Sequence, residues 1–100
     1  MGAPGMAKYN LQTVTAAAAA RVGSNDDHKL MGFLLFGGTA DSQVEFKNAA
    51  TDTGDVLMGG NALLDTSFFA DFTRFGGVKF STAMFCKPAG AGAICYVWFD

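Results

Sequence analysis

Apolar and polar residues alternate along much of this chain with the period of two that is typical of β-strands, and glycine-rich turns separate the alternating runs. Residues 8–15 alternate in this way, whereas residues 29–36 form a nearly continuous apolar run that is typical of a central strand covered on both faces. Residues 43–47 follow after a turn and place Val44 and Phe46 on one side. We therefore expect the last two runs to form a hairpin whose second strand directs these two side chains into a core.

Three other segments need more than the alternation to interpret. Residues 16–20 are five alanines, which are strong helix formers, but the run is too short to hold a helix alone. A strand that continues through this run competes with the helix, and we favour the strand. Residues 63–75 carry phenylalanines at spacings of three and four, which favours a short helical turn. Residues 56–58 are expected to pair briefly before Gly59 and Gly60 end the strand.

These patterns amount to six or seven short strands spaced about ten residues apart, which indicates an all-β domain over residues 8–100. We expect a small antiparallel β-sandwich or a jelly-roll-like barrel. Residues 1–7 are mostly small residues around a proline, which predicts a flexible N-terminal arm. Within this arm Met1, Pro4 and Met6 are the residues that we expect to dock on a partner, where the arm becomes ordered.

The C-terminal residues 79–99 are predicted to form a hairpin with two apolar faces. A turn centred after Gly90 would place Cys86 opposite Cys95 on the face that lines the core. The other face carries the larger apolar side chains Phe85, Ile94, Tyr96 and Trp98, where a solvated sheet would carry Lys, Thr or Glu. Either a second sheet of the same chain or a neighbouring subunit must cover these side chains, and we favour the neighbour.

The amino-acid composition also favours assembly. Half of the 100 residues are hydrophobic, and 16% are charged against the typical share of about 25%. So few charges cover a monomer's surface poorly, and we therefore expect a homo-oligomer. The net charge of −2 and the scattered basic residues argue against nucleic-acid binding. No apolar run approaches the roughly 20 residues that cross a bilayer, and no secretion signal is visible, so we expect synthesis in a cytoplasm and no membrane partner.

Aromatic residues make up 13% of the chain. We expect five of them in the core: Phe33, Phe36, Phe46, Phe80 and Phe99. For the remaining large rings near the C-terminus, the core of a two-sheet sandwich and a subunit interface stay equally open.

Candidate catalytic groups are few. Asp52-Thr53-Gly54 matches the tripeptide that holds the paired carboxylates of retroviral-type aspartic proteases, but Asp55 follows it and no buried apolar strand precedes it. We expect a solvated turn there. His28 is the single histidine, and we expect it in a solvated turn too. The two cysteines are expected to be small buried hydrophobes. The sequence thus predicts no catalytic residue, metal site or cofactor, and no enzyme.

Four stretches of sequence resemble the small structural proteins of tailed bacteriophages: residues 8–11 (KYNL), 33–38 (FLLFGG), 75–82 (FGGVKFST) and 90–100 (GAGAICYVWFD). The likeness extends over most of residues 8–100 and lies in the general sequence pattern and the composition, without a diagnostic motif. It implies an all-β protein, commonly trimeric, that decorates or cements a capsid by bridging subunits of the major capsid protein. A tail or neck component of the virion is the nearest alternative. A small oligomeric binding module with an open aromatic face is the alternative outside virions.

Overall fold

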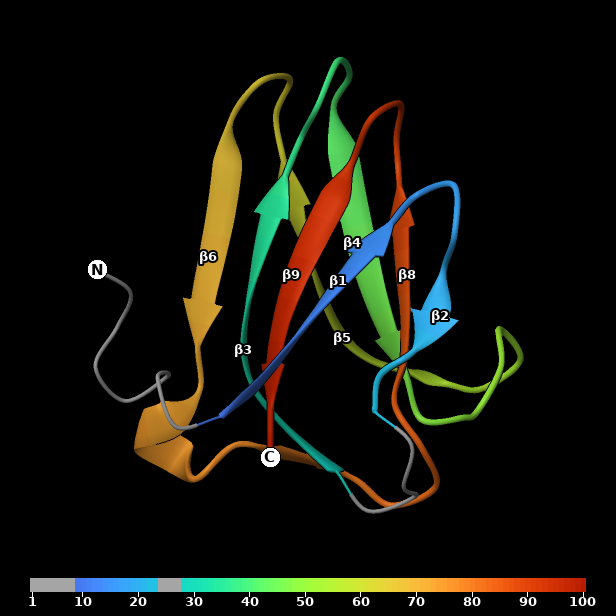
Figure 1. Ribbon diagram of the computed structural model, residues 1–100, viewed down its shortest axis with the longest axis vertical. Helices are drawn as coiled ribbons and strands as arrows, with labels where there is room; N and C mark the ends of the chain where they lie inside the picture. The colour runs from blue at the N-terminus through green and yellow to red at the C-terminus, as the bar shows by residue number, and fades with distance from the viewer. Residues whose placement is uncertain (1–8, 24–27) are drawn as a thin grey trace.

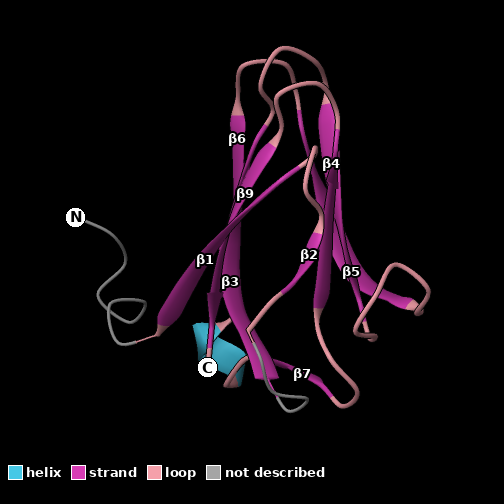
Figure 2. Cartoon of the chain, turned by 45° about the vertical axis from the view of Figure 1, so that its right-hand side comes forward, coloured by secondary structure: helices cyan, strands magenta, loops and turns pink. Residues whose placement is uncertain are grey.

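Two antiparallel β-sheets pack face to face in the computed structural model, which describes residues 9–23 and 28–100 (Figures 1 and 2). The first sheet has the order β1 (Asn10–Thr15), β9 (Ile94–Phe99), β3 (His28–Phe36) and β6 (Ser67–Asp71), and β7 (Val78–Phe80) pairs with the start of β3. The second sheet has the order β2 (Ala20–Arg21), β8 (Phe85–Ala89), β4 (Ser42–Lys47) and β5 (Val56–Ala62). A 3₁₀ turn, η2 (Thr73–Phe75), follows β6. The predicted β-sandwich is confirmed.

The core lies between the two sheets and is built from the inward side chains of both. Phe33 of β3 and Phe46 of β4 are fully buried, and their ring centroids are 5.0 Å apart across the sandwich. Phe80 is fully buried as well, and Phe99 nearly so. Phe36, expected in the core, is only half-buried, because strand alternation turns it to the outer side of the first sheet. Four of the five predicted core phenylalanines are therefore confirmed.

The predicted C-terminal hairpin is wrong. β9 pairs with β1 and β3 in the first sheet, whereas β8 pairs with β2 and β4 in the second. Between them the chain steps from one sheet to the other through a turn in which Gly90 and Gly92 take φ angles of 121° and 75°. Cys86 and Cys95 therefore belong to different sheets and meet inside the core, instead of forming a cross-strand pair. The hairpin expected from β3 and β4 fails for the same reason, although Val44 and Phe46 do face inward.

The alanine run forms neither a helix nor a continuous strand. Ala16 and Ala17 lie in a turn, after which the chain crosses to the second sheet as the short β2. The side chain of Gln12 fixes this crossing: its Nε2 donates to the carbonyl of Arg21 at 2.9 Å, and its Oε1 accepts from the N–H of Gly23 at 2.9 Å. A single amide thus satisfies two backbone groups where the chain changes sheets.

β5 and β6 also differ from expectation. β5 continues through Gly59 and Gly60, and β6 is a strand where a helical turn was expected, with only η2 helical. Phe68 points inward, with its ring centroid 5.8 Å from that of Phe33, and Phe69 points outward. Glycine at position 60 makes this possible, because a Cβ there would lie 2.8 Å from the Phe68 ring. Pairing with β3 therefore overrides the helical spacing of the phenylalanines.

The arm residues Met1, Pro4 and Met6 lie outside the described residues. Within the part of the chain that the structure describes, no helix is long and apolar enough to span a membrane.

Candidate interaction face

The outer face of the first sheet is covered by large apolar side chains. The strand register places Leu11 beside Trp98, Tyr96 beside Leu34, and Leu34 beside Phe69. We call this surface the apolar face, and its members are Leu11, Leu34, Phe36, Phe69, Ile94, Tyr96 and Trp98. It extends across all four main strands, so four segments far apart in the sequence build it.

Two of these side chains are exposed to solvent, and the other five are half-buried. Leu11 is 56% exposed and Phe69 is 45% exposed. The Phe69 and Trp98 rings pack edge to face, with centroids 6.1 Å apart and planes at 87°. Lys29 and Lys79 face each other at the β7 end, and Asp71 lies at the end of β6. An apolar centre with a charged rim is the usual anatomy of a protein–protein interface.

Phe85 does not belong to the apolar face, which corrects the prediction that it shares one surface with Ile94, Tyr96 and Trp98. It lies on β8, on the outer side of the second sheet, in register with Arg21 and Lys47. The error follows directly from the false hairpin, because alternation within one ribbon would have put Phe85 and Tyr96 on the same side. The other three predicted interface residues do lie on one surface.

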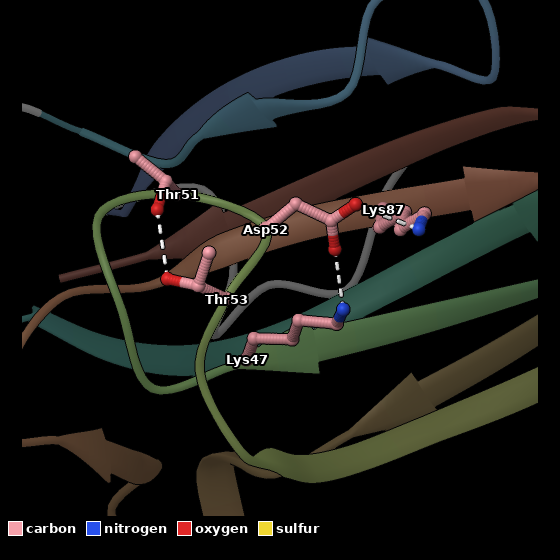
Figure 3. Close-up of polar contacts among 5 residues, drawn as sticks. All are labelled: Lys47, Thr51, Asp52, Thr53 and Lys87. Carbon is pink, nitrogen blue, oxygen red and sulfur yellow. Dashed lines mark hydrogen bonds and ion pairs between the residues drawn. The ribbon is translucent and has the colours of Figure 1, made fainter.

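The outer face of the second sheet carries charged side chains around Phe85, and its edge strand β5 adds the exposed Val56 and Leu57. Asp52, in the loop that follows β4, accepts hydrogen bonds from Lys47 and from Lys87, the latter at 2.7 Å (Figure 3). The bond from Lys47, followed by that from Lys87, holds the pKa of the Asp52 carboxyl below its usual 3.8, and the same contact raises the pKa of Lys87. Glu45 and Gln43 face outward from β4 beside them. This surface is suited to water.

The Asp52-Thr53-Gly54 segment is an exposed turn, as predicted. Its carboxylate is ionised and held by two lysines, whereas an aspartic-protease dyad needs two carboxylates that share one proton in a dry site. Asp52 therefore anchors residues 48–55 onto the second sheet. The sequence contained no sign of this role, because Lys87 is 35 residues away from Asp52.

His28 is not in a solvated turn, contrary to prediction. It begins β3 and is only 8% exposed. Its Nδ1 lies 3.1 Å from the carbonyl oxygen of Asp100, and its ring meets the Phe99 ring edge to face at 5.1 Å. The partners come from the opposite end of the chain, so the local sequence could not indicate them.

Cys86 and Cys95 are free thiols with no solvent exposure. The hydrogen bond between the two thiols, together with burial, raises the pKa of the Cys86 thiol. The Cys86 thiol therefore stays protonated, and burial keeps both thiols away from reagents in the folded state. Residues 9–23 and 28–100 contain no group of three or more His, Cys, Asp or Glu side chains that could hold a metal ion.

No protein-family model matches this chain, and no curated protein matches its sequence. Among solved structures it is similar to a protein of Bacillus endospore appendages, with a TM-score of 0.51 and 16% identity over 92% of this chain and 83% of the other. It overlaps more weakly with PirA, with a TM-score of 0.47 and 13% identity over 91% of this chain and 92% of that one. The overlap with the Tobacco streak virus coat protein has a TM-score of 0.32 and 15% identity, over 89% and 85% of the two chains. The first similarity supports the sandwich fold.

Proposed function

We propose that this protein is a non-enzymatic structural component of a tailed-phage virion, which decorates or cements the capsid by docking its apolar face on a neighbouring shell protein. The observation that carries this proposal is the contrast between the two outer faces. The first sheet presents aromatic and aliphatic side chains, and the second presents lysines with their acidic partners.

Such a contrast suits a subunit that lies between a shell and water. The apolar face gains free energy when a partner removes it from solvent, by about 25 cal/mol for each Å² buried. The charged face remains hydrated on the outside. A specific contact covers about 800 Å² per partner, and a decoration protein repeats it at many lattice positions, so each contact can be individually modest.

The fold neighbour is compatible with a structural role but does not supply its chemistry. The Bacillus endospore appendages are described as disulfide-linked pili. The present chain has two cysteines, and both are fully buried in the core. Folded copies of this protein therefore cannot form a disulfide with one another. Non-covalent contact between surfaces has to hold any assembly together.

The test is photo-cross-linking inside intact particles that contain this chain, with the cross-linker at position 11 on the apolar face. We expect cross-links to the major capsid subunit. Links to tail or neck proteins would instead place the chain at that part of the virion. An absence of links to any virion protein, together with binding of a small ligand at Tyr96 and Trp98, would refute the proposal in favour of a binding module.

A matched pair of variants tests the face itself. Leu11→Lys places a charge on the apolar face at an exposed site, and Gln43→Lys places the same charge on the charged face. Burying an unpaired ammonium costs several kcal/mol, so Leu11→Lys should weaken binding to particles by at least about tenfold. Gln43→Lys should bind like the wild type. Equal binding of both variants would show that the apolar face is not the docking surface.

A further inference from the structure

β6 forms one edge of the first sheet. It pairs with β3 on one side, and its other side has no strand partner among the described residues (Figure 1). Free sheet edges are usually guarded by lysine, proline or a bulge, because their backbone groups can pair with another chain. β6 reads Ser-Phe-Phe-Ala-Asp and has none of these.

Exposed apolar side chains gather around the same edge. Of the eight large hydrophobic side chains that are exposed in residues 9–23 and 28–100, five lie in β6 or within four residues of its ends along the chain: Leu63, Leu64, Phe68, Phe69 and Phe75. The opposite edge of the sheet, β1, carries only Leu11 from this set. The edge that is open to pairing is thus also the more apolar one.

We propose that a second copy of this chain pairs with β6 about a two-fold axis, β6 against β6, so that the two first sheets become one continuous sheet. An antiparallel pair centred on Phe69 sets each Phe69 against that of the partner subunit. Phe68 then lies beside Ala70 of the partner subunit on the inner side, so that a large residue meets a small one. Antiparallel pairs of aromatic residues are among the favourable cross-strand contacts.

The charges around β6 are complementary under this operator. Asp71 falls opposite Ser67 of the partner subunit, so no like charges oppose each other. Bonds from the backbone and side chain of Thr73 hold the pKa of Asp71 below its usual 3.8, and it is ionised at neutral pH. Asp65, which precedes the start of β6, then lies near the far end of the partner's β6, which Arg74 of the partner subunit follows. A second copy therefore meets no electrostatic obstacle.

Continuity with the apolar face also favours a second copy over a foreign strand. Phe69 belongs both to this edge and to the apolar face. Pairing of β6 with itself joins the two apolar faces into one surface of twice the width, whereas a strand from another protein would leave a single face. The contact uses the backbone edge of β6 and shares only Phe69 with the apolar face, and it forms in the purified protein without any virion partner.

The test introduces a charge of either sign at position 67. Ser67→Glu puts a carboxylate opposite Asp71 of the partner subunit, and Ser67→Lys puts an ammonium there, each twice in a dimer. Cross-strand charge pairs contribute about 0.2–1 kcal/mol each, so the dimer should dissociate about 2- to 30-fold more readily with Glu and correspondingly less with Lys. Thr13→Glu and Thr13→Lys are the matched controls, since Thr13 is an exposed hydroxyl residue on the opposite edge.

The measurement is sedimentation velocity of the purified full chain over a concentration series. We expect a monomer–dimer equilibrium that responds to the charge at position 67 and ignores the charge at position 13. A monomer at every concentration, a trimer as the resemblance implies, or filaments from head-to-tail pairing of β6 with β1 would each overturn the proposal. The same holds if the Glu and Lys variants at position 67 shift the equilibrium in the same direction. These outcomes leave binding to particles untouched, so the two proposals fail separately.

Discussion

A methyl group added at Gly60 tests how β5 and β6 close one side of the sandwich. The Cβ of Gly60→Ala would lie 2.8 and 2.9 Å from two atoms of the Phe68 ring and 3.1 Å from Cζ of Phe33. Phe33 is fully buried and cannot retreat, whereas Phe68 is 40% exposed and can rotate outward. We therefore expect Phe68 to yield.

The change in the free energy of unfolding follows from the burial that the Phe68 ring loses. Full burial of a phenylalanine contributes about 1.5–3 kcal/mol, and about three fifths of this ring is covered, so its release costs about 1–2 kcal/mol. Replacing glycine by alanine restricts the unfolded chain and returns about 0.4–1 kcal/mol. Gly60→Ala should therefore destabilise the protein by about 1 kcal/mol. In a Phe68→Ala background the clash with the Phe68 ring is gone and only the 3.1 Å contact with Phe33 remains, so the same change should cost clearly less.

The assay is urea unfolding followed by Trp98 fluorescence at one fixed subunit concentration. With a slope of about 1 kcal/mol per M, the single change should lower the midpoint by about 1 M. Gly76→Ala is the control, because Gly76 has a φ of 75° with no atom within 4 Å of an added Cβ. It should cost about 1 kcal/mol of backbone strain in both backgrounds. If Gly60→Ala costs the same with and without the Phe68 ring, the packing explanation is refuted.

Three further predictions concern the polar and thiol groups. Cys86 and Cys95 should react with a thiol reagent at least about 10³-fold faster in denaturant than in native buffer, because only unfolding exposes them, and rapid native labelling would contradict their burial. The lowered pKa of Asp52 means that its ion pairs stabilise the fold above about pH 3.8 and are lost as the pH falls through the folded-state value. The melting temperature of Asp52→Asn should therefore fall less on acidification than that of the wild type. Parallel curves of melting temperature against pH for the two proteins would argue against this. Gln12→Ala removes two hydrogen bonds and should cost about 1–3 kcal/mol in urea unfolding, with Gln12→Glu in between because it keeps only the acceptor.

Alternation in the sequence predicted most of the strands and most of the inward side chains, with β6 and Phe36 as exceptions, but not which sheet each strand joins. Val44 and Phe46 point into the core as expected, although β4 is not the hairpin partner of β3. The side-chain pattern of a hairpin and of a connection between two sheets is the same. The choice depends on distant partners: β9 lies between β1 and β3, and β1 is more than 70 residues earlier in the chain. No local pattern contains that information.

The apolar face shows the same limit. Ile94, Tyr96 and Trp98 were expected on one surface because they alternate within one strand, and the structure places them there. Leu34 and Phe69 were missed, since they come from β3 and β6, and the spacing of the phenylalanines suggested a helix for the latter. Strand pairing brings these segments together in one face, although the local sequence of β6 favours a different structure.

The apolar residues of this chain exceed what one core can hold, and the structure shows where the excess lies. A two-layer sandwich buries only the inward half of each strand, yet the outer positions of β9 are apolar as well. On the second sheet most outer positions of β4 and β8 carry polar or charged side chains, and Phe85 lies among them. The few charged residues are therefore enough to cover the outer face of one sheet only. If the first sheet faced solvent alone, Lys substitutions on it would be harmless or favourable for solubility. Leu11→Lys should instead weaken partner binding while leaving the unfolding midpoint nearly unchanged, and this separation would identify the outward apolar residues as contact residues and not as part of the folded core.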